Sequence, residues 1–131
     1  MIDLMKMLLV VSMLESPTTL EKRASLPVRH KGDEIGIYGD RERNVVRWIE
    51  ATGVRVTVAQ VAMDYDLQTE AAIWYAKHEV GLRITPAEFL RRWRQGPNSD
   101  PAKASDKVRA YVADGVKRYD ELMKKREVAK P

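Results

Sequence analysis

The sequence of 131 residues contains no cysteine, only two histidines and a single phenylalanine. Without cysteine, the chain has no disulfide bond, no thiolate nucleophile and no zinc site built on cysteine ligands. The longest apolar run, residues 7–14, includes one serine and is far shorter than the roughly 20 residues that cross a bilayer. A signal peptide is not indicated either, because Asp3 offsets Lys6 and no small-x-small cleavage motif follows. These absences predict a cytoplasmic protein with no membrane partner.

Residues that could form a catalytic, metal-binding or phosphate-binding site are also scarce. His30 and His78 have no spacing that would make a metal pair. The glycines within residues 32–39 lack the phosphate-loop spacing and the Lys-Ser/Thr step that belongs to it. Turns and helix caps explain the acids near Asp33 and Asp64. We therefore expect no enzyme activity, no cofactor and no bound metal.

The composition itself is that of a globular protein with a small basic excess. Apolar residues make up 44% and charged residues 32% of the chain, values typical of soluble domains. A length of 131 residues suits one domain rather than two. The 23 lysines and arginines outnumber 19 acidic residues, which leaves a formal net charge of +4. This excess favours acidic partners, namely double-stranded DNA or an acidic protein surface.

The first 40 residues combine apolar helical sequence with a short hairpin. Residues 1–15 are rich in Met and Leu and predict a helix with little polar face, which has to be buried against the rest of the chain. Ser16 precedes a second helix start over residues 17–24. In residues 27–38, apolar and polar positions alternate around Gly32, which predicts a small β-hairpin, with a loop as the alternative.

Two strong helix signals lie in the middle of the chain, in the section that we assign to residues 41–95. Asp40 is expected to cap a helix over residues 41–52, and Gly53 stands where a C-terminal cap belongs. Thr85 is expected to cap a second helix, with a proline in its first position. The Gly-Pro pair that follows residue 95 has to end this helix.

The C-terminal section consists of a linker and one long helix. Residues 96–104 are rich in small residues and proline and are assigned to the linker. Within residues 105–123, apolar positions recur every three or four residues for about two heptads, as in a helix that packs on a neighbour. A homodimer would use this stripe. Residues 124–131 are expected to fray, and the whole chain is predicted to be a mainly α-helical single domain of five to seven helices.

Residues 57–82 have the pattern of two short helices around a tight turn. Thr57 and Gln60 supply the two halves of a capping box for the first helix. The turn is expected at residues 64–66, because Asp bonds its own backbone in turns more readily than it continues a helix. Thr69 is then expected to cap the second helix. The chain therefore has a predicted helix-turn-helix core.

Residues 41–84 resemble the core of a winged-helix DNA-binding domain, with a helix, an extended segment and then two further helices. Val61 and Ala62 match the apolar-alanine pair of that family's second helix. Leu67 matches the apolar residue after the turn, and Ala72 matches the small core position of the third helix. A capped helix follows at once and leaves no room for a two-stranded wing, so a wingless variant is expected. The resemblance implies that the third helix enters the major groove of DNA.

Two sets of residues are candidates for DNA contact. The candidates for base contact lie at the start of the third helix and on its outward side, and they are Gln68, Thr69, Lys77 and His78. The candidates for phosphate contact form the densest basic cluster of the chain, and they are Arg83, Arg91, Arg92 and Arg94. A solvated helix face is the alternative interpretation of the arginine cluster.

Trp74 points to a different class of function. Glu70 on the same helix would repel phosphates, and a tryptophan has no evident role on a duplex. An exposed tryptophan beside polar residues is typical of a protein-protein anchor, whereas a buried one would only pack in the interior. The sequence thus predicts a non-enzymatic DNA-binding regulator that uses a helix-turn-helix. Its alternative is a small protein-binding adaptor or inhibitor, for example of a transcription or nucleic-acid-processing machine, that uses Trp74 and the basic helix.

Overall fold

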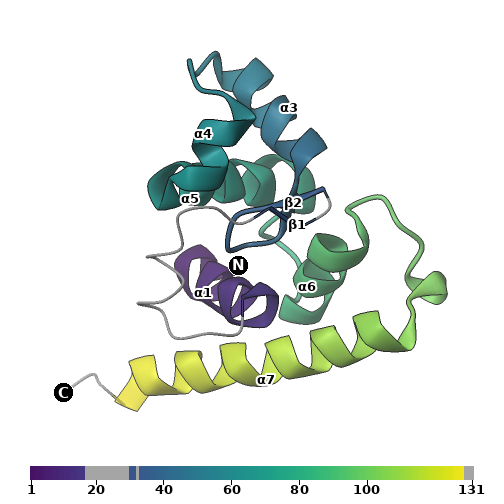
Figure 1. Ribbon diagram of the computed structural model, residues 1–131. Coiled ribbons are helices and arrows are strands. Elements are labelled where there is room, and N and C mark those ends of the chain that lie inside the picture. The colour runs from purple at the N-terminus through teal and green to yellow at the C-terminus, as the bar shows by residue number, and fades with distance from the viewer. Residues whose placement is uncertain (17–29, 32, 129–131) are drawn as a thin grey trace.

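The computed structural model describes residues 1–16, 30–31 and 33–128 of the chain. In these ranges the protein is a mainly helical single domain with six α-helices and one small antiparallel sheet. Helices α3 (Glu42–Thr52), α4 (Val58–Met63) and α5 (Tyr65–Tyr75) form one group at the top of Figure 1. Helices α1 (Leu4–Glu15) and α6 (Pro86–Gln95) lie below them, and α7 (Asp106–Val128) crosses beneath both. The predicted fold class is confirmed. The helix start predicted over residues 17–24 lies outside the described residues.

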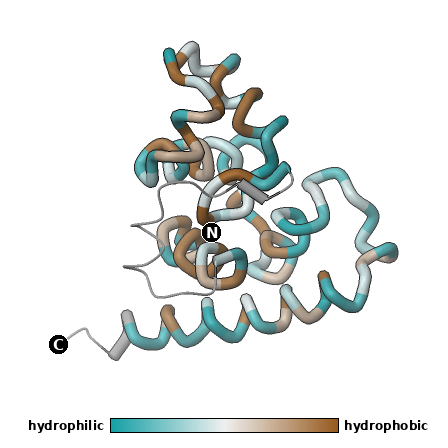
Figure 2. The backbone as a smooth tube through the Cα atoms, in the orientation of Figure 1, coloured by the Kyte–Doolittle hydropathy of each residue, from teal (hydrophilic) through white to brown (hydrophobic). Residues whose placement is uncertain are grey.

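The first helix, α1 (Leu4–Glu15), forms the apolar centre of the lower half. Its N-terminus is capped by Asp3, whose side chain accepts a hydrogen bond from the backbone N–H of Lys6. Figure 2 shows the hydrophobic positions of α1 gathered between the other elements. The predicted buried helix within residues 1–15 is confirmed, and its most buried side chains are Met7, Leu8, Val10 and Val11.

Three strands of two residues each form the sheet: β1 (His30–Lys31), β2 (Glu34–Ile35) and β3 (Asp40–Arg41). They pair antiparallel in the order β1-β2-β3, so Ile35 is in register with one residue of each outer strand. The hairpin predicted within residues 27–38 is confirmed for β1 and β2, and its first residues lie outside the described ranges.

The helix predicted over residues 41–52 is α3 (Glu42–Thr52), and one of its two predicted caps is wrong. Asp40 pairs in the sheet and is buried, so Arg41 occupies the N-terminal cap position and makes no side-chain capping bond. Strand pairing therefore overrides the local capping preference of Asp40. At the other end, Gly53 is left-handed with φ 70°, as the prediction required.

The predicted capping box at Thr57 is present at the start of α4 (Val58–Met63). The Thr57 hydroxyl accepts from the Gln60 backbone N–H at 3.1 Å, and the Gln60 side chain accepts from the Thr57 N–H at 2.8 Å. Two backbone donors that an isolated helix end leaves without partners are thereby satisfied.

The second helix of the motif starts earlier than predicted. It is α5 (Tyr65–Tyr75), and its cap is Asp64, whose Oδ1 accepts from the N–H groups of Asp66 and Leu67 at 2.9 and 3.2 Å. Thr69 lies inside the helix and bonds the carbonyl of Tyr65, so the predicted cap at Thr69 is wrong. The turn between α4 and α5 is reduced to Asp64, because this aspartate is the first residue able to cap.

Three further elements lie between α5 and the last helix. The π-helical turn η1 (Ala76–Val80) extends α5, and α6 (Pro86–Gln95) starts after Thr85, whose hydroxyl accepts from the Glu88 N–H as predicted. The linker contains a 3₁₀ turn, η2 (Pro101–Lys103).

The last helix, α7 (Asp106–Val128), is longer than expected. It continues through residues 124–128, which were predicted to fray. Gly115 lies where α7 meets its neighbours: a Cβ at this position would come within 2.6 Å of Leu90 and 3.0 Å of Leu14. The apolar stripe thus packs within the chain against α1 and α6. A homodimer through residues 105–123 stays a prediction.

Two clusters of buried side chains hold these elements together. The larger one joins α1, α5, η1, α6 and α7. The smaller one fills the space between β2, α3, α4 and α5, and it consists of Ile35, Val45, Trp48, Val61, Ala62 and Ala71. Burial of one large apolar side chain contributes about 1.5–3 kcal/mol, so the four members larger than alanine give the three helices a core of their own. We call α3, α4, α5 and η1, residues 42–80, the helix-turn-helix unit.

Candidate nucleic-acid interface

Two of the predicted base-contacting residues are covered in this structure. Gln68 is buried with 6% of its surface exposed. Its Oε1 accepts from the Ile37 N–H at 3.0 Å, and its Nε2 donates to the carbonyls of Val61 and Ala62, also at 3.0 Å. The hydroxyl of the second residue, Thr69, lies 2.9 Å from the Tyr38 hydroxyl. The structure therefore places Gln68 in the interior against the loop after β2 and Thr69 partly buried beside the same loop.

The exposed part of the α5 start is acidic. Asp64, Asp66 and Glu70 are all exposed there. Carboxylates at these positions repel the phosphates that flank a major groove, so the N-terminal half of α5 is a poor surface for DNA.

The other two base-contact candidates are exposed. Lys77 and His78 lie on η1, at the far end of the same continuous helical segment. His78 stacks on Trp74 with ring centroids 5.0 Å apart, and its Nδ1 lies 3.0 Å from the Trp74 carbonyl oxygen. Arg83 follows on the loop and is exposed as well. Lys77, His78 and Arg83 are therefore three predicted contacts that face solvent.

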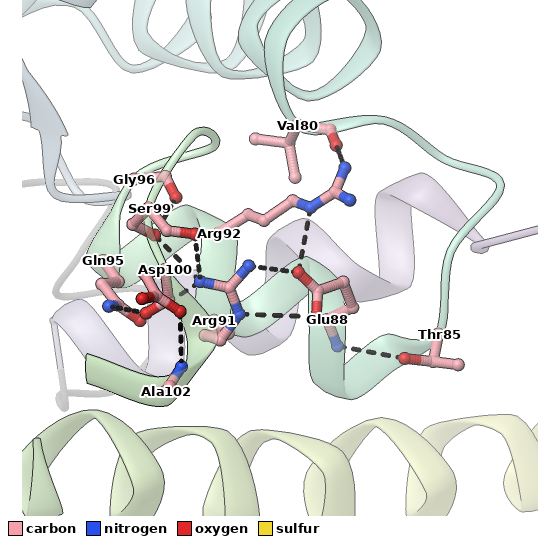
Figure 3. Close-up of polar contacts among 10 residues, drawn as sticks. All are labelled: Val80, Thr85, Glu88, Arg91, Arg92, Gln95, Gly96, Ser99, Asp100 and Ala102. Carbon is pink, nitrogen blue, oxygen red and sulfur yellow. Dashed lines mark hydrogen bonds and ion pairs between the residues drawn. The ribbon is translucent and has the colours of Figure 1, made fainter. Parts of the chain in front are cut away.

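Arg91, the first of the three α6 arginines predicted to contact phosphate, is buried and holds the chain together (Figure 3). It forms an ion pair with Glu88. It also donates to Gln95 at 3.2 Å, to the Ser99 carbonyl at 3.3 Å and to the Ser99 hydroxyl at 2.9 Å. This side chain therefore fixes the loop after α6 to the helix itself.

Arg92 and Arg94 have internal partners too. Arg92 donates to Glu88 at 3.0 Å and to the Val80 carbonyl at 2.8 Å, which ties α6 to the end of η1 (Figure 3). Hydrogen bonds from Arg91 and Arg92 lower the pKa of Glu88, the Arg91 bond more than the other.

Arg94 reaches across the domain. It pairs with Glu15 at 3.3 Å and with Glu34 at 3.4 Å, and its guanidinium lies 5.7 Å from the centre of the Tyr111 ring. Burial is the main reason that the pKa of Glu15 is raised, and the charge of Arg94 opposes the rise. The structure thus brings Arg91, Arg92 and Arg94 into internal contacts rather than onto one free basic face.

A cleft that was not predicted lies between α3 and residues 95–99. Its volume is about 380 Å³, and α3 contributes Arg43, Asn44 and Arg47 to its lining. Both arginines are exposed, and Arg47 also pairs with Glu79. The spacing of four residues between Arg43 and Arg47 was the available signal, because it places both on one side of a helix.

Trp74 occupies an intermediate position. It is half-buried and packs against both core clusters, and its exposed edge lines a shallow groove with Arg47, Glu50, Ala51 and Glu79. The ring supports the core and still borders a surface groove, and its role as a protein-protein anchor stays a prediction.

Asp40 is a buried acid that lines a small cavity together with Arg43 and Asn44, two residues that also line the cleft. Within the described part of the chain, no donor makes a hydrogen bond to either of its carboxylate oxygens. Burial raises the pKa of Asp40 to about 7, and the nearby Asn44 side chain and Arg41 backbone N–H offset only part of this rise. Burial and the charge of Asp40 in turn raise the pKa of Tyr75 to about 12.

In residues 1–16, 30–31 and 33–128, no three His, Asp or Glu side chains form a group that would hold a metal ion. No helix in these ranges has the length and hydropathy needed to cross a membrane. Comparisons with protein families, with curated proteins and with solved structures find no match, so the resemblance of residues 41–84 to winged-helix domains stays a prediction.

Proposed function

We propose that this protein is a non-enzymatic DNA-binding regulator that contacts the DNA backbone through its helix-turn-helix unit. The observation that carries the proposal is the three-helix arrangement of α3, α4 and α5 around a core cluster of their own. Such a unit presents a rigid surface to a duplex, and rigid elements position binding residues better than loops do.

The distribution of charge favours backbone contact over base reading. Gln68 and Thr69 are engaged with residues 37 and 38, and the exposed start of α5 is acidic. Lys77 and His78 are then the side chains left for base edges. Arg83 is available for phosphates, together with the exposed α3 arginines, Arg43 and Arg47. Contacts to phosphate supply affinity without reading sequence, so little discrimination between DNA sequences is expected.

A salt series of duplex binding tests this proposal. Fluorescence anisotropy with a random-sequence duplex should show an affinity that falls steeply with salt, with a slope of about 0.9 per neutralised phosphate. The double variant Lys77→Gln/Arg83→Gln should reduce that slope by up to about 2. The matched control, Lys107→Gln/Lys117→Gln, removes the same charge from exposed positions of α7 and should leave the slope unchanged.

Two results would refute DNA binding by this unit. One is that no duplex binds at low salt. The other is that the α7 control loses as much of the salt slope as the Lys77 and Arg83 variant does, because binding would then follow net charge and not this surface.

Protein binding is the second candidate, and the groove beside Trp74 favours it. An aromatic edge bordered by Arg47, Glu50 and Glu79 combines an apolar contact with charged residues at its rim, which is the usual anatomy of a protein interface. Asp66 and Glu70 on the exposed start of α5 count against DNA but not against a protein partner.

A substitution that fills the groove distinguishes protein binding from a purely structural role of Trp74. Ala51 lines the groove and is exposed, so Ala51→Arg should fill it without disturbing the core. Affinity capture of a partner by the tagged protein should be lost with Ala51→Arg and kept with Ala59→Arg, a control at an exposed position of α4. Equal capture by both variants would rule out the groove as the binding surface.

A further inference from the structure

The cleft between α3 and residues 95–99 is lined by two arginines and otherwise by uncharged residues. Arg43 and Arg47 supply the charge, and no aspartate or glutamate is part of the lining. Within the described residues Arg43 makes no ion pair, and more than half of the Arg47 side chain stays exposed beside its pair with Glu79. Each guanidinium presents five N–H donors in a planar fork, a geometry that matches the oxygens of a phosphate.

The opposite wall of the cleft, residues 95–99, is held in place by hydrogen bonds from Arg91. Arg91 bonds the side chain of Gln95 and both oxygens of Ser99, and the Ser99 hydroxyl donates to the Gly96 carbonyl at 2.5 Å (Figure 3). Gly96 has φ 119°, a conformation that other residues rarely adopt, so the loop depends on glycine here. These contacts give residues 95–99 a fixed shape, and a fixed wall is what a small binding site needs.

From this arrangement we propose that the cleft is a binding site for a phosphate group, with Arg43 as the main ligand and Arg47 beside it. Asn44 and Asn98, which carry uncharged amide side chains, are also part of the lining. The volume of about 380 Å³ exceeds that of a lone phosphate ion, so the group belongs to a larger molecule. A phosphorylated small molecule and a phosphodiester of a DNA strand are the two sources of this chemistry. The site itself does not depend on the proposed DNA binding.

Besides Glu79, which pairs with Arg47, Asp40 is an acid close to this site, because it lines a small cavity with Arg43 and Asn44. Burial raises the pKa of Asp40 to about 7, so its carboxyl is mostly neutral at pH 6. Binding of an anion next to it is therefore best measured at pH 6.

The test is an NMR titration of the ¹⁵N-labelled full chain at pH 6 with inorganic phosphate, at constant ionic strength. Saturable shifts should centre on residues 95–99 and on the first turns of α3. Arg43→Gln should weaken binding about ten-fold or more, because a hydrogen bond to a charged group is lost. Arg55→Gln is the control, since Arg55 is exposed, carries the same charge and does not line the cleft.

Shifts that are scattered and do not saturate, or an equal effect of the two variants, would overturn the proposal. Two further titrations of the wild-type chain identify the source of the phosphate. Adenosine monophosphate that binds at least about ten-fold tighter than inorganic phosphate would support a phosphorylated small molecule. A duplex whose affinity depends on Arg43 and not on Arg55 would support the DNA backbone. Phosphate binding without any duplex binding would refute the proposed function and leave the phosphate site supported.

Discussion

The side-chain oxygen of Gln68 accepts a hydrogen bond from the backbone N–H of Ile37 at 3.0 Å, so a residue expected to read bases instead holds the loop after β2. The amide nitrogen of the same side chain donates to the Val61 and Ala62 carbonyls. One buried glutamine thereby joins α4, α5 and the sheet loop. A DNA surface on this protein has to lie elsewhere on the helix-turn-helix unit.

Gln68→Ala is expected to destabilise the protein by about 1–3 kcal/mol, because the N–H of Ile37 and two carbonyls lose a buried partner. Urea unfolding followed by circular dichroism measures this loss. Glu70→Ala, at an exposed position of the same helix, should change the free energy of unfolding by less than about 0.5 kcal/mol. If Gln68→Ala proves as stable as the wild type, Gln68 does not hold the loop.

Arg91→Ala should also lower stability, by about 1–3 kcal/mol, because Glu88, Gln95 and Ser99 lose their shared partner. Its effect on the salt slope of duplex binding should be close to zero, because a buried arginine has no free contact with phosphates. Arg83→Ala should show the reverse pattern, with an unchanged unfolding midpoint and a shallower slope. If Arg91→Ala instead reduces the salt slope of duplex binding and leaves the stability unchanged, Arg91 contacts DNA and does not hold the loop after α6.

Gly115→Ala tests the close packing of α7. A methyl group there would lie within 2.6 Å of Leu90 and 3.0 Å of Leu14, in a part of the core where Leu90 is fully buried. We expect a net loss of about 1–2 kcal/mol, because the steric cost exceeds the helix preference of alanine. Lys117→Ala on the exposed side of α7 serves as the control in thermal unfolding. A stabilised Gly115→Ala protein would mean that α7 does not pack this closely.

Asp40→Asn tests whether the titration of the buried Asp40 carboxyl makes the stability of the protein depend on pH. Burial raises the pKa of Asp40 from its ordinary value of 3.8 to about 7, so the folded state binds this proton more tightly than the unfolded state does. Stability linked to Asp40 is therefore fully present below about pH 4 and is lost as the pH rises to 7. Above pH 7 the loss of stability caused by the buried, ionised Asp40 carboxylate stays constant.

The asparagine variant lacks this charge, so its melting temperature should exceed that of the wild type at pH 8, and the gap should narrow toward pH 5. Thermal unfolding of both proteins across this range measures the gap. A gap that is the same at pH 5 and pH 8 would show that Asp40 does not titrate in this window.

The parts of the fold that the sequence predicted correctly depend on neighbours in the chain. The cap pairs at Thr57 and Thr85 join residues three apart, and Gly53 ends α3 through its own backbone. Such signals are visible in any short window of sequence. Asp40 is the exception, because its strand partner overrides its capping preference.

The site was harder to predict because its contacts span the chain. Gln68 and Ile37 are 31 residues apart, and Arg94 and Glu15 are 79 apart. No local pattern shows that such groups will pair. The ion pairs of Glu88 are different, because partners three and four residues later are a recognised helical spacing. That spacing was an available signal of neutralisation within the helix, and the prediction of phosphate contacts did not use it.

The most direct test of DNA binding by the helix-turn-helix unit is a chemical-shift map. A random-sequence duplex is added to the ¹⁵N-labelled protein at low salt, and the amides that shift are identified. The account predicts shifts around Lys77, His78 and Arg83 and along the exposed side of α3 near Arg43 and Arg47, with little change in α7. Shifts confined to α7 or to the acidic start of α5, or no shifts at all, would contradict it.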